Sequence, residues 1–167
     1  MKSHEIFQHM SPALAVEILT YLQREQTPVY KTVVQGLAQQ RRLRPVFVER
    51  KPPPERYTWL QAALGRKVSD TFAAHLLQSW LLGARKPLLC DFLDSLGIAH
   101  DADATVEELP ASPPKDKLHQ VITQLLDKYP TETVAVYLHA FHDMDSTVSW
   151  PPLGEVLHED ERLKLGA

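Results

Sequence analysis

The chain has 167 residues, of which 44% are hydrophobic and 23% charged, and its formal net charge is −3. This composition is typical of a globular protein and excludes a disordered chain. Its apolar runs stay well below the roughly 20 residues needed to cross a bilayer, and no apolar signal stretch follows Met1. We therefore expect a cytoplasmic protein with no membrane partner, folded as a single domain over residues 1–167.

Helix punctuation appears early in the chain. Ser11-Pro12 reads as an N-cap followed by proline in the first turn, and Thr27-Pro28 repeats the pattern. Apolar residues then recur at helical spacing until Arg44-Pro45, where the second helix should stop.

Residues 45–56 look different from the rest of the chain. Val46-Phe47-Val48 resembles a short strand, and Pro52-Pro53-Pro54 favours polyproline conformation. The sequence therefore predicts an extended, proline-rich crossover here, followed by a short helix ending at Gly65.

The two best-marked helices follow. Ser69 should cap one that ends near Gly83, and Pro87 should open another that ends near Gly97. Both have wide apolar faces, which predicts that they form the centre of the core. The side chains expected to be inaccessible to solvent are Leu76, Trp80, Phe92 and Leu93. Cys90, the single cysteine, is expected to be a buried structural thiol.

The remainder of the chain begins with a polar connection over residues 99–114, in which residues 105–108 could form one helical turn. Helices opened by Ser112-Pro113, Thr131 and Ser149 complete the chain. The predicted fold is all-α: an irregular array or bundle of about eight helices arranged as helical hairpins, with one extended crossover.

Basic and acidic residues are distributed unevenly along the chain. Residues 1–67 hold 11 Lys and Arg against 5 Asp and Glu, whereas residues 68–167 hold 7 against 16. A subdivision into basic N-terminal helices (1–66) and an acidic helical core (67–167) is therefore possible. We favour mutual attraction of the two parts, within one chain or between copies, over an external anionic partner.

Two groups of residues are candidate sites. His139 and His142 lie three apart on a predicted helix and could share a metal with Asp143 or Asp145, although a pair at a helix C-terminus needs no metal. Arg41, Arg42 and Arg44 could follow phosphates, but the acidic pI near 6.2 disfavours nucleic acid.

A tryptophan-lined groove is a third possibility, and Trp80 is its candidate binding residue. The sequence has no glycine-rich nucleotide loop and no nucleophile elbow, so no catalytic residue and no cofactor are assigned. The predicted function is a non-enzymatic helical interaction module for a protein or peptide partner, or for itself. The alternatives are a metal protein or enzyme using His139 and His142, and a nucleic-acid binder using the basic half.

Overall fold

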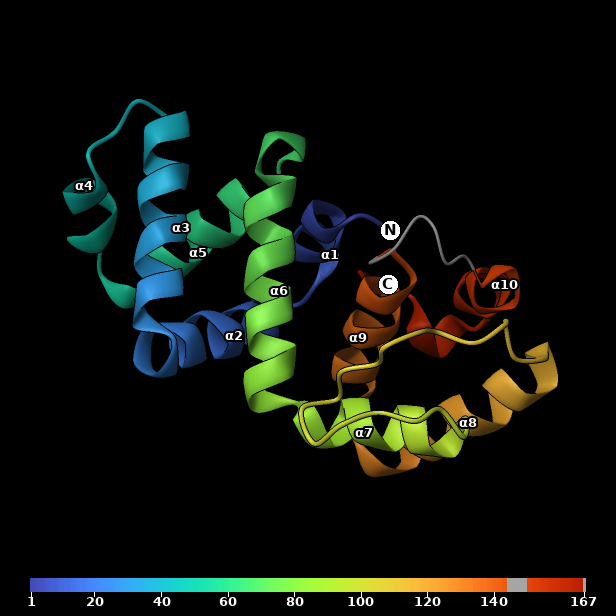
Figure 1. Ribbon diagram of the computed structural model, residues 1–167. Helices are drawn as coiled ribbons and strands as arrows, with labels where there is room; N and C mark the ends of the chain where they lie inside the picture. The colour runs from blue at the N-terminus through green and yellow to red at the C-terminus, as the bar shows by residue number, and fades with distance from the viewer. Residues whose placement is uncertain (144–149, 167) are drawn as a thin grey trace. The chain divides into compact units, whose positions relative to one another are not determined.

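The computed structural model describes residues 1–143 and 150–166, and all regular structure in these ranges is helical (Figure 1). Ten α-helices and two short 3-10 helices are found there, without a strand, which confirms the predicted all-α class. Within these ranges no helix is both long and apolar enough to cross a membrane.

The chain packs as two compact units, one of residues 1–80 with Gly166 and one of residues 81–165. The division falls inside α6 (Asp70–Ala84), which continues from one unit into the other. Residues 1–80 hold 11 Lys and Arg against 6 Asp and Glu, and residues 81–165 hold 7 against 15. The first unit is therefore basic and the second acidic.

The first unit is built around α2 and α3, which pack against each other and against α5. Its helices are α1 (Ser3–His9), α2 (Pro12–Glu25), α3 (Thr27–Gln40), α4 (Pro45–Glu49), α5 (Pro53–Leu64), the 3-10 helix η1 (Lys67–Ser69) and the first part of α6. The predicted cap is present at α2, where the Ser11 hydroxyl accepts a hydrogen bond from the Leu14 amide at 3.2 Å. Helix α1, which the sequence analysis did not predict, packs on α5.

The predicted extended crossover over residues 45–56 is wrong, because this segment forms α4 and the start of α5. Pro45 and Pro53 stand in the first turns of these helices, where a missing amide proton costs no hydrogen bond. Val48 is completely buried. Packing of the segment against α3 and α5 thus overrides the weak strand preference of Val46-Phe47-Val48.

Three smaller predictions also need correction or fall outside the structure. Residues 105–108 form no helical turn. Ser69 is the last residue of η1 and directly precedes α6, and its hydroxyl donates to the side-chain oxygen of Gln40 at 3.0 Å. The predicted cap at Ser149 lies outside the described residues.

The second unit contains α7 (Lys86–Ser95), α8 (Lys115–Lys128), α9 (Thr131–Asp143), α10 (Pro151–Glu159) and the 3-10 helix η2 (Glu161–Leu163). Helix α8 packs against α7, α9 and α10. Between α7 and α8 the chain runs over residues 99–114 without a helix. An aromatic cluster forms much of the core, in which Phe92 meets Tyr137 and Phe141 edge to face at centroid distances of 5.4 and 5.3 Å.

The predicted core residues are confirmed. Leu76, Trp80 and Phe92 have no exposed surface, and Leu93 is 3% exposed. Helical spacing in the two best-marked helices therefore located the buried faces correctly.

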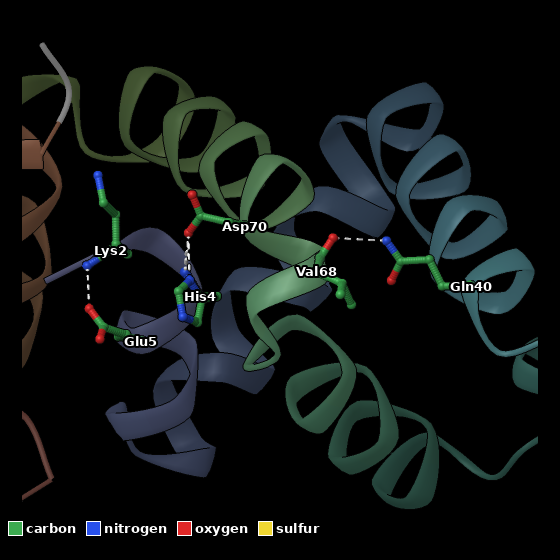
Figure 2. A network of polar contacts seen from close by, with 6 residues as sticks. All are labelled: Lys2, His4, Glu5, Gln40, Val68 and Asp70. Carbon is green, nitrogen blue, oxygen red and sulfur yellow. Dashed lines mark hydrogen bonds and ion pairs between the residues drawn. The ribbon is translucent and has the colours of Figure 1, made fainter. Parts of the chain in front are cut away.

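A polar network fixes the start of α6 within the first unit (Figure 2). The Asp70 carboxylate accepts a hydrogen bond from the His4 amide at 3.0 Å and lies 2.7 Å from the His4 ring. Gln40, at the end of α3, donates to the Val68 carbonyl at 3.1 Å. Helices α1 and α3 are thereby joined to the turn that begins α6.

Truncation of Phe92 tests the aromatic cluster. Phe92→Ala should cost about 3–5 kcal/mol, because it removes a fully buried ring and leaves a cavity between α7 and α9. The free energy of unfolding from urea titration measures this cost. A loss below about 1 kcal/mol would show that the ring is not part of a packed core.

The contribution of the Asp70 carboxylate to stability can be tested by varying the pH. Burial opposes its ionisation, but hydrogen bonds from the His4 backbone and ring outweigh burial and hold the pKa of Asp70 below its ordinary value. A depressed pKa stabilises the fold fully above the unfolded value near about 3.9, and this stability is lost as pH falls through the folded pKa.

We therefore expect Asp70→Asn to lower the urea midpoint at pH 7, and its deficit against the parent to shrink below about pH 4. Asp116→Asn, a change at an exposed aspartate of α8, is the control. A deficit that stays constant between pH 7 and pH 3 would contradict the assignment.

Candidate interaction surface

Helix α3 ends in a tight chain reversal that determines where the following residues point. The Leu43 amide donates to the Ala38 carbonyl at 2.9 Å, and the Arg42 amide donates to the Gln39 carbonyl at 3.0 Å. These two bonds form a Schellman motif, which satisfies carbonyls that a helix end otherwise leaves open. The motif turns the chain directly into α4.

Arg42 occupies the position in this motif that normally takes glycine. Its φ of 55° is left-handed, a conformation that costs an L-residue roughly 1–2 kcal/mol because Cβ crowds the following carbonyl. Such strain in a residue that is not glycine is a reason to look for a functional role of its side chain. The Arg42 side chain is exposed.

Apolar side chains are exposed directly after this reversal. Val48 is completely buried and anchors α4, which lies beside α3 in Figure 1. Phe47 is 57% exposed, Leu43 38% and Val46 37%. A single exposed apolar residue needs no explanation, but here three occur within five consecutive positions.

Cations surround these apolar residues. Arg41, Arg42, Arg44 and Arg50 are exposed, and none of them forms an ion pair with another described residue. We call this group the basic–apolar surface, and it consists of Arg41, Arg42, Leu43, Arg44, Val46, Phe47 and Arg50. The surface carries four positive charges, none of which is held in an ion pair within the described residues.

Arg56, at the start of α5, belongs to the packing below the surface. Its guanidinium donates to the Glu49 carbonyl at 3.3 Å and lies 5.2 Å from the centre of the Tyr57 ring. These contacts stabilise the turn between α4 and α5. Arg56 is therefore excluded from the surface.

The binding residues predicted from the sequence differ in their exposure in the structure. Arg41, Arg42 and Arg44 come together at the end of α3, whereas Trp80 is fully buried in α6 and is not a surface residue. Sequence reasoning missed Leu43, Val46 and Phe47. The signal for Val46 and Phe47 was the apolar run Val46-Phe47-Val48, but this run was interpreted as strand-like, and Leu43 was not singled out.

The two histidines of the proposed metal pair lie on α9. His139 is 7% exposed, and its Nε2 donates to the Leu163 carbonyl at 2.9 Å, while burial lowers its pKa. The half-buried His142 ring faces Gly154 of α10, and burial lowers its pKa as well. Among the described residues these two belong to no group of three or more metal-ligating side chains, and Asp145 lies outside them.

Cys90 is half-buried on α7 and not fully buried as predicted. Burial and the nearby carboxylates of Asp94 and Asp91 raise the pKa of its thiol. A raised pKa decreases the thiolate fraction and so disfavours a nucleophilic role.

Comparison with known proteins returned no match. No family model matches the chain, and neither curated proteins nor solved structures gave a match. The function of the surface is therefore inferred from its own residues and contacts.

Replacement of Arg42 by glycine tests whether the left-handed backbone conformation of Arg42 is strained. Arg42→Gly should stabilise the protein by about 1 kcal/mol, because glycine adopts a left-handed backbone without a clash. Arg41→Gly removes the same charge at an adjacent position with φ −95°, and it should destabilise slightly. Urea titration of both variants gives the comparison, and equal losses of stability in the two would refute strain at Arg42.

Proposed function

We propose that the protein is a helical interaction module whose basic–apolar surface binds an acidic segment of a protein partner. The observation that carries this proposal is the exposed Phe47 on α4 between exposed, unpaired arginines. A segment that brings carboxylates and apolar side chains together would complement both features.

The apolar part of the surface supplies a driving force that does not depend on salt. Burial of apolar area contributes roughly 25 cal/mol per Å². Val46 and Phe47 are partly exposed on the short helix α4, which is anchored by Val48, and Leu43 is partly exposed in the reversal before it. A partner side chain laid over them would remove this area from water without unfolding α4.

The arginines determine which partner is preferred. A guanidinium presents a planar set of donors that matches a carboxylate in two parallel hydrogen bonds. Because Arg41, Arg42, Arg44 and Arg50 have no carboxylate partner within the described part of the chain, binding breaks no existing ion pair. Their combined field would also increase the rate of encounter with an anionic segment.

Nucleic acid shares the negative charge but fits the protein less well. The chain is acidic as a whole, with net charge −3, and this would repel a long polyanion that extends beyond the surface. Phe47 could stack on a base, so an oligonucleotide belongs in the test. The apolar trio favours a peptide because Leu43 and Val46 offer no flat ring for stacking.

The test uses a fluorescently labelled synthetic peptide of alternating glutamate and leucine, with fluorescence anisotropy as the readout. R41E/R42E/R44E should weaken binding at least tenfold, and Phe47→Ser should weaken it less while the salt dependence persists. R24E/K31E/K67E changes the charge of the same unit equally at other exposed positions and is the control.

The proposal would be wrong if the control variant lost as much affinity as the arginine variant. Tighter binding of a single-stranded oligonucleotide than of the peptide, lost in R41E/R42E/R44E, would instead assign the surface to nucleic acid. Circular dichroism of each variant verifies that the helices are intact.

A further inference from the structure

Resting on the proposed function, we infer that the acidic segment bound by the basic–apolar surface is the loop at residues 106–110 of a second copy of this chain. The loop has the sequence Val-Glu-Glu-Leu-Pro. It combines two adjacent carboxylates with apolar neighbours, which is the chemistry that the surface requires.

The loop lies in an acidic stretch of the second unit. Residues 87–114 contain six Asp and Glu and no Lys or Arg. Residues 99–114 also form a long connection without a helix. Connections of this length without regular structure are uncommon in compact units and are often binding loops.

Most carboxylates in this stretch already have partners. Asp91 pairs with Lys128 at 2.6 Å, Asp94 with His100 at 2.7 Å, and Asp103 with Lys86 at 2.7 Å. The Asp101 carboxylate accepts hydrogen bonds from two backbone amides of its own turn. These four groups are therefore occupied within the unit.

Glu107 and Glu108 are the exception. Both are exposed, and neither has an ion-pair or hydrogen-bond partner among the described residues. Val106 and Leu109 on either side are half-exposed. The unpaired carboxylates thus stand next to apolar side chains, as the unpaired arginines do on the basic–apolar surface.

The loop is held at both ends. On one side Asp101 accepts from the amides of Asp103 and Thr105 at 2.8 and 2.9 Å. On the other side the Trp150 indole donates to the Pro110 carbonyl at 3.3 Å. Because these anchors fix the chain around Glu107 and Glu108, little conformational freedom would be lost on binding.

Charge complementarity supports a second copy as the source of the segment. The unit that carries the surface has an excess of Lys and Arg, 11 against 6 acids, and the unit that carries the loop has 15 acids against 7. Each chain has one surface and one loop, so the contact is head to tail and generates a ring or an open series. Its strength would fall with salt.

Sedimentation velocity of the 167-residue chain tests this. The parent protein should self-associate at low salt and become monomeric at 0.5 M salt, roughly, where screening is strong. R41E/R42E/R44E and E107K/E108K should each be monomeric. D116K/D127K is the control for E107K/E108K, because it also replaces two acidic residues by lysines, here at exposed positions of α8. It should associate like the parent.

Mixing the two defective variants gives the most specific readout. E107K/E108K retains the surface and R41E/R42E/R44E retains the loop, so an equimolar mixture should associate although neither variant does so alone. A monomeric parent at low salt that still binds the glutamate–leucine peptide would overturn this inference and leave the proposed function intact. A parent that neither associates nor binds the peptide would overturn both. Association that survives E107K/E108K would also overturn the inference.

Discussion

The reversal at the end of α3 is the constraint on which the surface depends. Two hydrogen bonds, from Leu43 to Ala38 and from Arg42 to Gln39, close the helix and start α4 within a few residues. If α3 continued by one more turn, Arg42 would point away from Arg41 and Arg44, since residues one or two apart on a helix point in different directions. The Schellman motif instead ends α3 at these arginines, so that α4 with Phe47 begins directly after Arg44.

The ion pairs show which charged side chains of the basic and the acidic unit are already neutralised within the chain. In the second unit, lysines pair locally with acids, as Lys128 does with Asp91 and Lys115 with Glu155 and Glu159. Exposed pairs of this kind contribute little to stability, but they remove charge from the set available for binding. Among the groups that form no ion pair within the described residues are a run of arginines in one unit and two adjacent glutamates in the other. Net charge alone would not have separated these from the neutralised groups.

Sequence patterns predicted the parts of the fold that depend on local chemistry. Ser11-Pro12 caps α2, and helical spacing placed Trp80 and Phe92 in the core, because capping and amphipathic burial act over a few residues. The strand-like reading of Val46-Phe47-Val48 failed because this segment packs as a helix against α3 and α5, the helices before and after it, with Val48 buried. Sequence patterns over a few residues do not predict this packing between helices.

The candidate site could be predicted only in part for a related reason. The arginine run is visible in the sequence, but which of its charges remain unpaired depends on tertiary contacts. Arg56 looks like Arg50 in the sequence, yet it is engaged by Glu49 and Tyr57. Trp80 shows the opposite error, since an aromatic suited to a groove is enclosed in the core.

Backbone strain connects the two segments that the further inference brings together. Among the described residues, Arg42 and Ala104 are the non-glycine residues with positive φ, at 55° and 60°. Arg42 lies in the basic–apolar surface, and Ala104 lies in the turn closed by Asp101 that precedes Glu107 and Glu108. Residues whose backbone conformation is unfavourable for their residue type, without a gain in packing, are found most often at functional sites. At Arg42 glycine would satisfy the backbone better but would carry no charge, and under the proposed function this charge is the reason that arginine is kept there.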